Sequence, residues 1–221
     1  MAYKDKSQLP LDLFKPPAPT LENFFPGANS VALNILRSVR EGNGPQIVYL
    51  YGQTGVGCTH LLEALGPVKK EVPVFVEAQR IYVVDNVETL DPIGEAKLFD
   101  LINEIRAHPG TSLVAAGHFS PVELSEKGFR QDVTSRLRWG TVLEILPLTQ
   151  EQTRVEFIKR VEQVGLHVSP EVLSWIEVYL PRDMHTLTTL LASATRMSLT
   201  TNRQLTIPLL KECLKEDSDI E

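Results

Sequence analysis

Residues 52–59 read Gly-Gln-Thr-Gly-Val-Gly-Cys-Thr and match the phosphate-binding loop pattern G-x-x-x-x-G-K-[ST] everywhere except at the lysine. In such a loop the backbone amides surround a phosphate, and the following helix adds its positive N-terminus. The lysine reaches the β- and γ-phosphates, but here its place is taken by Cys58, whose thiol is uncharged at neutral pH. The pattern therefore predicts a phosphate cradle without its cation. The residues of this predicted cradle are Gly52, Gly55, Gly57, Cys58 and Thr59.

An acid follows the next strand pattern along the chain. Residues 80–86 read Arg-Ile-Tyr-Val-Val-Asp-Asn, which predicts a buried strand that ends at Asp85. In phosphate-loop NTPases an acid at this place holds Mg²⁺, so Thr59 and Asp85 predict at most a weak Mg²⁺ site. Asn86 stands where a second acid would activate the attacking water, and an amide cannot take that proton. Taken alone, the loop is equally typical of a tight turn that binds nothing.

Composition limits the class of protein. The chain has 221 residues, of which 43% are hydrophobic, enough for one core or for one core and a small second one. A net charge of −6 disfavours a broad basic surface for duplex DNA. The two cysteines, Cys58 and Cys213, lie far apart and favour a reducing compartment. No apolar stretch is long enough to cross a membrane or resembles a signal peptide, so we expect a cytoplasmic protein.

The chain divides into three regions. Residues 1–20 are polar and proline-rich, which predicts a flexible arm. Residues 21–147 alternate apolar strand patterns with amphipathic helices, which predicts an α/β core around a parallel sheet. Residues 148–221 are helical throughout and predict a small lid domain. The expected strands cover residues 47–51, 80–85, 112–117 and 142–146, and the expected helices cover 29–40, 59–65, 93–107, 150–164, 182–198 and 207–215, with one more beginning at 170.

Residues 73–78 are the exception to this regular alternation. Their sequence, Pro-Val-Phe-Val-Glu-Ala, resembles a strand, but the next strand begins almost at once at Arg80. Parallel neighbours need a crossover of about a dozen residues or more. The segment is therefore either an irregular or antiparallel edge piece, or a strand that has lost its crossover helix.

Several motifs together resemble one family. A phosphate-loop core followed by a helical bundle looks like an AAA+ module. Residues 134–140, Thr-Ser-Arg-Leu-Arg-Trp-Gly, resemble the S-R-[FL]-x-W-G signature of the bacterial initiator DnaA and of the shorter Hda family of DnaA-related regulators. Residues 24–30 resemble their entry to the first helix, and residues 85–88 and 205–208 are closer to Hda. The resemblance covers nearly the whole chain and implies an AAA+ fold with a lid.

The arm carries a second resemblance. Residues 8–14, Gln-Leu-Pro-Leu-Asp-Leu-Phe, are similar to the peptide with which bacterial proteins bind the replicative sliding clamp, the β subunit of DNA polymerase III. A glutamine amide offers a donor and an acceptor, and the leucines and phenylalanine offer apolar anchors. A tail that docks on its own domain is the alternative. The predicted clamp-binding residues are Gln8, Leu9, Leu11, Leu13 and Phe14.

The resemblance implies a regulatory role. Proteins of the Hda family bind the DNA-loaded clamp and promote hydrolysis of the ATP held by DnaA, through an arginine finger that this sequence matches at Arg136. The expected partners are therefore the clamp and DnaA, with DNA reached through the clamp and a homo-oligomer left open. A surface arginine in an ion pair is the alternative for Arg136. The alternatives for the function are a non-hydrolysing adaptor, a clamp-loader-like subunit and a weak autonomous ATPase.

Departures from the family pattern predict a degenerate nucleotide site. Cys58 replaces the loop lysine, and Ala116 stands near the strand end where a polar sensor is expected. His185 fills the slot of the second sensor arginine, and the nearby Arg182 is the alternative cation. Loss of several phosphate contacts argues against an enzyme with its own ATPase activity. Weak binding of ADP, through the loop amides and Thr59, is left open as the only cofactor.

Overall fold

The computed structural model describes residues 18–163, 165, 167–179, 184–201 and 205–218. They divide into two compact units, an α/β unit of residues 18–149 and a helical unit that begins at Gln150. The predicted clamp-binding residues Gln8, Leu9, Leu11, Leu13 and Phe14 lie outside the described residues, as does Arg182.

A parallel sheet forms the centre of the α/β unit. Its strands are β1 (Ile47–Tyr51), β2 (Ile81–Val84), β3 (Ser112–Gly117) and β4 (Thr141–Glu144). They lie in the order β2-β3-β1-β4, and each neighbouring pair is parallel. This arrangement confirms the predicted α/β fold class with a parallel sheet. Because all four strands run in one direction, the loops after β1, β2 and β3 gather at one edge of the sheet.

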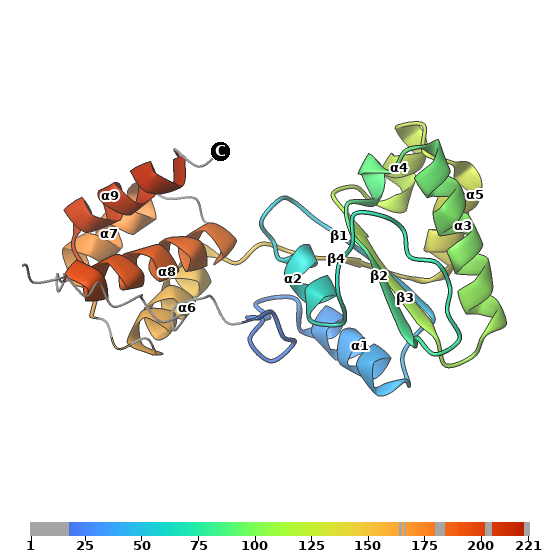
Figure 1. The fold of residues 1–221 in the computed structure, drawn as a ribbon, viewed down its shortest axis with the longest axis horizontal. Coiled ribbons are helices and arrows are strands. Elements are labelled where there is room, and N and C mark those ends of the chain that lie inside the picture. Colours follow the sequence, from blue (N-terminus) through green and yellow to red (C-terminus); the bar gives the residue numbers. More distant parts are fainter. Residues whose placement is uncertain (1–17, 164, 166, 180–183, 202–204, 219–221) are drawn as a thin grey trace, which may run out of the picture. The chain divides into compact units, whose positions relative to one another are not determined.

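Helices cover both faces of this sheet. The helices are α1 (Ser30–Glu41), α2 (Cys58–Glu63), the short η1 (Val87–Thr89), α3 (Pro92–Ala107), α4 (Pro121–Glu126) and α5 (Gln131–Trp139). Figure 1 shows α1 and α2 on one side of the strands and α3, α4 and α5 on the other. Sequence patterns predicted α1, α2 and α3 but not α4 and α5.

The alternation of side chains along each strand builds the two cores. On β1, Tyr49 packs into the core shared with α3, α4 and α5, whereas Val48 and Leu50 pack into the core shared with α1 and α2. On β3, Leu113 and Val114 divide between the same two cores. Both sides of each strand are thus buried, which explains why these strands appear in the sequence as unbroken apolar runs.

Residues 73–78 do not form a strand. Of the alternatives left open by the sequence, the irregular segment is the correct one. Residues 72–76 have no regular secondary structure, and among the described residues no strand pairs with the outer edge of β2. The Tyr82 hydroxyl instead accepts a hydrogen bond from the Val76 N–H and donates one to the Val76 carbonyl, both at 2.7 Å. The Phe75 ring stacks on the Tyr82 ring, with centroids 5.7 Å apart. Side-chain contacts therefore fix this segment where a ladder was expected.

The helical unit has a core of its own. Its helices are α6 (Gln150–Gln163), α7 (Pro170–Tyr179), α8 (Met184–Thr201) and α9 (Ile207–Ser218). Buried side chains from all four helices meet in one cluster, which includes Phe157, Ile176, Leu190 and Leu209. Across the described part of both units, every helix falls short of the length and apolar character that a membrane span requires.

Candidate functional site

Glycines shape the predicted phosphate loop. A Cβ on Gly52 would lie 2.5 Å from the carbonyl oxygen of Ile145, so only glycine lets the chain leave β1 this close to the residue that follows β4. Gly55 and Gly57 have φ values of 86° and 102°, in the left-handed region that favours glycine. Residues 53–55 form an exposed tip. The backbone conformation therefore fits a phosphate cradle, and it fits a tight turn that binds nothing equally well.

The cation slot of this loop holds a neutral group. Cys58 is the first residue of α2. Burial, and next the nearby Asp85 carboxylate, raises the pKa of the Cys58 thiol from 9.0 to about 12. The thiol therefore stays protonated at physiological pH and supplies neither a positive charge nor a strong donor to a phosphate.

The two predicted Mg²⁺ residues lie in contact. The Thr59 hydroxyl donates a 2.6 Å hydrogen bond to Asp85 Oδ2. Asp85 Oδ1 accepts the N–H of Asn86, whose φ of 48° is left-handed. The first turn of α2 and the residue that follows β2 are thus joined by a hydrogen bond. These oxygens are ligands that suit Mg²⁺, whereas the described residues include no cluster of three or more metal-binding side chains.

An acid and a histidine that the sequence did not single out lie at the same edge of the sheet. The Glu88 side chain is 13% exposed, and its Oε1 is in hydrogen-bond contact with His118 Nδ1. Its Oε2 also accepts the backbone N–H of His118 at 3.3 Å. Ala116 is fully buried in β3, and the first polar side chain after it along the chain is that of His118. The position of His118 directly after a predicted strand was the available signal.

Arg136 lies on α5 and is held by α3. Its Nε donates to Asn103 Oδ1 at 3.0 Å, and its Nη1 donates to the Asp132 carbonyl at 3.2 Å. The guanidinium carbon lies 3.9 Å from the centroid of the Phe99 ring. Asn103 and Phe99 both belong to α3. Asn103 is 33 residues away from Arg136 in the sequence, so no local sequence pattern linked the two.

Arg136 differs from its neighbour Arg130 in charge pairing. Arg130 forms a close ion pair with Asp132, with Nη2 and Oδ2 2.6 Å apart. Within the described residues Arg136 forms no ion pair; its partners are an amide, a carbonyl and aromatic rings. Within the described residues, Arg136 is therefore not the surface arginine in an ion pair that was the alternative interpretation.

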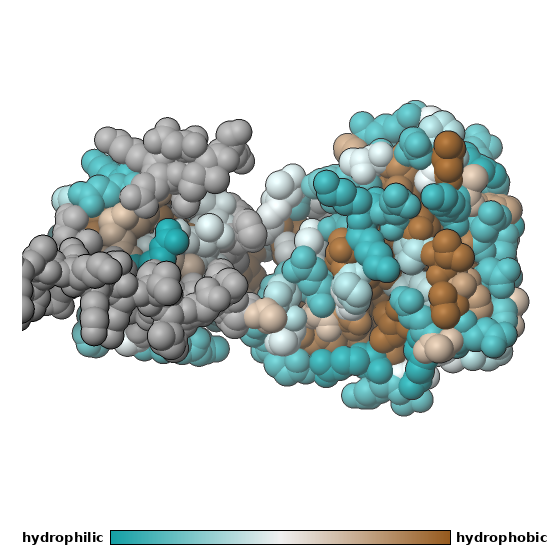
Figure 2. Space-filling model, in the orientation of Figure 1, coloured by the Kyte–Doolittle hydropathy of each residue, from teal (hydrophilic) through white to brown (hydrophobic). Residues whose placement is uncertain are grey.

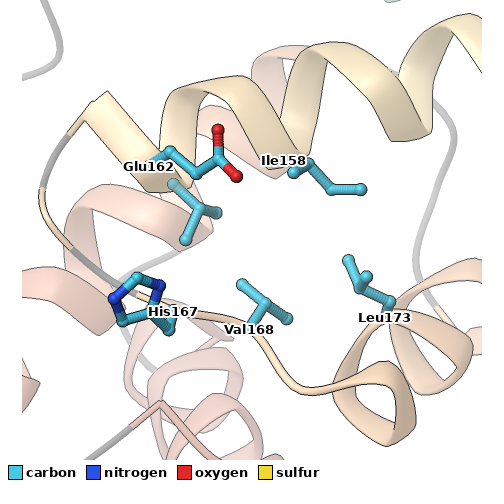
Figure 3. Close-up of a pocket in the computed structure, with 6 residues that line it drawn as sticks. Ile158, Glu162, His167, Val168 and Leu173 are labelled. Atoms are coloured by element: carbon cyan, nitrogen blue, oxygen red, sulfur yellow. The ribbon is translucent and has the colours of Figure 1, made fainter.

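The last predicted nucleotide residue belongs to the helical unit. His185 is the second residue of α8, and its side chain falls outside the described part. A shallow hollow of about 90 Å³ lies elsewhere in this unit, between α6 and the start of α7 (Figure 3). Glu162 and His167 stand over an apolar lining of Ile158, Val161, Val168 and Leu173. The residues that line it include none of the predicted site residues whose side chains the structure describes.

Known proteins resemble the chain in sequence and in fold. The family model described as the lid domain of Hda matches residues 150–214. An uncharacterised protein of Haemophilus influenzae is 32% identical over 230 residues, which cover 94% of this chain and 98% of that protein. The crystal structure of domain III of DnaA from Thermotoga maritima has a TM-score of 0.71 at 22% identity and covers 90% of this chain and 97% of its own. The structure of DnaA from Aquifex aeolicus bound to AMPPCP has a TM-score of 0.67 at 17% identity. The match covers 94% of this chain and 72% of that DnaA chain.

These similarities agree with the order of the motifs along the chain. The matched lid region coincides with the helical unit, and the solved structures share the AAA+ fold of the DnaA core. The likeness to the Haemophilus protein extends over nearly the full length of both chains. The chain therefore belongs to the Hda-like, DnaA-related AAA+ proteins.

Proposed function

We propose that this DnaA-related regulator promotes hydrolysis of the ATP bound to the initiator DnaA and supplies Arg136 as an arginine finger in trans. The observation that carries the proposal is a guanidinium that is held in place without being neutralised. Asn103 and Phe99 restrict its orientation, and within the described residues no carboxylate pairs with it. A finger needs both properties, because it must meet the charge that develops on a partner's γ-phosphate.

The test is the rate at which ATP-loaded DnaA hydrolyses its nucleotide in the presence of this protein and clamp-loaded DNA. Arg136→Ala is expected to lower the stimulated rate by about 10³-fold, the contribution typical of such fingers. Arg136→Lys keeps the charge but loses the planar fork, so it is expected to restore little. Full stimulation by Arg136→Ala would contradict the proposal.

The protein's own nucleotide loop, in this proposal, is vestigial and the chain is a pseudo-ATPase. The Thr59–Asp85 pair and the loop glycines suit a nucleotide with Mg²⁺, whereas the neutral Cys58 thiol leaves the phosphates without a cation. ADP is then bound weakly at most. Cys58→Lys is expected to tighten ADP binding by about 30-fold, since a hydrogen bond to a charged group contributes about 2 kcal/mol. Calorimetric titration of both proteins, with Cys58→Ala as control, measures this difference.

An autonomous ATPase is the competing function, and the Thr59–Asp85 contact is what favours it. A turnover assay of the purified chain separates the two. Steady hydrolysis without DnaA would contradict the pseudo-ATPase proposal.

Tethering to the sliding clamp completes the proposal and places the protein in the cytoplasm with the replication machinery. It depends on the similarity of residues 8–14 to clamp-binding peptides. Gln8→Ala combined with Leu11→Ala is expected to abolish binding to purified clamp and to leave the fold intact. If the double variant still binds, the peptide assignment is wrong. Clamp binding without any contact with DnaA would instead support a pure adaptor.

A further inference from the structure

Trp139 is an exposed aromatic residue beside the proposed finger. Its side chain is 62% exposed at the end of α5, three residues after Arg136. Figure 2 shows that hydrophobic residues interrupt the mainly hydrophilic surface of the α/β unit. Among residues 18–149, Trp139 is the one aromatic side chain in the group of large hydrophobics that are highly exposed; the others are Val31, Val74, Val76, Ile93, Val122 and Leu146. A large exposed indole is unusual and indicates a contact surface.

Two helices hold this indole in a defined setting. Phe99, Asn103 and Arg106 follow one another at intervals of four and three residues, so they share one face of α3. On α5, Arg136 contacts the first two of them, and Trp139 contacts Arg106. The guanidinium carbon of Arg106 lies 4.9 Å from the Trp139 ring centroid, and that of Arg136 lies 5.6 Å from it. The indole and the proposed finger are therefore parts of one continuous surface.

This surface carries positive charge that the described residues leave unpaired. Neither Arg106 nor Arg136 forms an ion pair there, although Arg130 close by is paired with Asp132. Two guanidinium groups thus flank an exposed aromatic ring. Tryptophan and arginine are the side chains that most often carry the binding energy of protein interfaces.

We propose that Trp139, oriented by Arg106, is the anchor with which this protein docks on the ATP-bound face of DnaA. The inference rests on the proposed function and specifies its contact surface. The occupant is the exposed edge of a bound nucleoside triphosphate together with the protein surface beside it, because the triphosphate is anionic and complements the two guanidinium groups. Trp139 provides binding energy, whereas Arg136 acts on the transition state. Docking and catalysis are then assigned to different residues on the same helix.

Steady-state kinetics separate these two roles. The rate of DnaA-bound ATP hydrolysis is measured against the concentration of this protein. Trp139→Ala is expected to raise the half-saturating concentration about tenfold or more and to lower the maximal rate far less than Arg136→Ala does. Arg106→Gln is expected to raise it several-fold, and Trp139→Phe is expected to retain most of the affinity. Ile93→Ala, at a site of similar exposure (66%) at the other end of α3, is the matched control and is expected to change nothing.

A second measurement does not depend on catalysis. The chain has two tryptophans, so a protein labelled with 5-fluorotryptophan gives two ¹⁹F signals, and Trp139→Phe identifies the one from Trp139. Addition of ATP-bound DnaA is expected to shift or broaden that signal. A Trp139 signal that stays unchanged at saturating DnaA would overturn the anchor.

The outcomes distinguish this inference from the proposed function. If Arg136→Ala abolishes stimulation but Trp139→Ala keeps the half-saturating concentration of the natural protein, the anchor is wrong and the finger stands. If the natural protein neither binds nor stimulates ATP-bound DnaA, both are wrong. Melting temperatures of the variants, which are expected to match the natural protein because Trp139 and Arg106 are exposed, exclude misfolding as the cause.

Discussion

The environment of Cys58 in the phosphate loop determines whether its thiol carries a charge. Its thiol is largely buried between α2 and the sheet, next to the Asp85 carboxylate. Both effects disfavour the thiolate, which is the nucleophilic form. A residue that occupies the place of a lysine is therefore uncharged and also unreactive.

This environment predicts slow alkylation of the native protein. A pKa raised from 9.0 to about 12 lowers the thiolate fraction at pH 8 by about 10³-fold relative to an ordinary cysteine. Cys213, the second cysteine, is fully buried, so we expect less than one label per chain after prolonged incubation with iodoacetamide at pH 8. The label is counted by mass spectrometry, and the unfolded chain, in which both thiols react, is the control. Rapid labelling of Cys58 in the native state would contradict the burial and the raised pKa of its thiol.

The sequence anticipated part of the residue-scale picture. Thr59 and Asp85 were predicted together as weak Mg²⁺ ligands from the phosphate-loop pattern, and their side chains are in hydrogen-bond contact. The Glu88–His118 pair and the Asn103 contact of Arg136 were not anticipated. Both join segments about 30 residues apart, and which polar side chains meet across such a distance depends on packing that no local pattern contains.

At the scale of elements, two glycines let β4 approach β1. A Cβ on Gly140, which closes the S-R-L-x-W-G signature, would lie 2.5 Å from the carbonyl oxygen of Ile47 at one end of the pair. Gly52 has the same relation to the carbonyl of Ile145 at the other end. Both contacts are with backbone atoms, which cannot rotate away.

Gly140→Ala is therefore expected to destabilise the protein. Overpacking of this kind costs about 1–3 kcal/mol, measured as the free energy of unfolding in urea. Gly66→Ala is the matched control, because a Cβ at Gly66 would meet no atom within 4 Å. It is expected to be neutral or to stabilise by up to about 1 kcal/mol. Equal effects of the two substitutions would contradict the close-approach explanation.

Prediction of the elements succeeded where a segment's own sequence determines its structure. β1 and β3 were predicted to the residue, because each is an unbroken apolar run with a turn at its end. The segment at residues 73–78 has the same local character, yet whether it pairs depends on an available partner, and Tyr82 takes that role with a side chain. The short helices α4 and α5 have too few apolar residues for a clear periodicity, so they were missed.

At the scale of the whole molecule, the two units have separate cores. The buried side chains of the α/β unit and those of the helical unit form distinct clusters with no member in common. Each unit therefore has its own source of stability.

A cavity in one core is expected to leave the other intact. Leu209 and Leu113 are fully buried, one in each unit, and truncation to alanine at either site costs about 2–5 kcal/mol. Leu209→Ala is expected to speed amide exchange in α6 to α9 and to leave β1 and β3 protected, and Leu113→Ala is expected to do the reverse. Hydrogen-exchange mass spectrometry reports both. Uniform loss of protection across the chain would indicate that the units unfold together.

The Tyr82 phenol also controls how one margin of the sheet opens. A strand in a ladder opens by breaking several backbone hydrogen bonds together. Here the Val76 N–H donates to the Tyr82 hydroxyl, and the Val76 carbonyl accepts from that hydroxyl and from the Gln79 N–H. Few hydrogen bonds therefore hold this segment against β2, and we expect it to detach at a small fraction of the free energy of global unfolding. The margin beside β2 is then expected to open locally while the rest of the α/β unit stays closed.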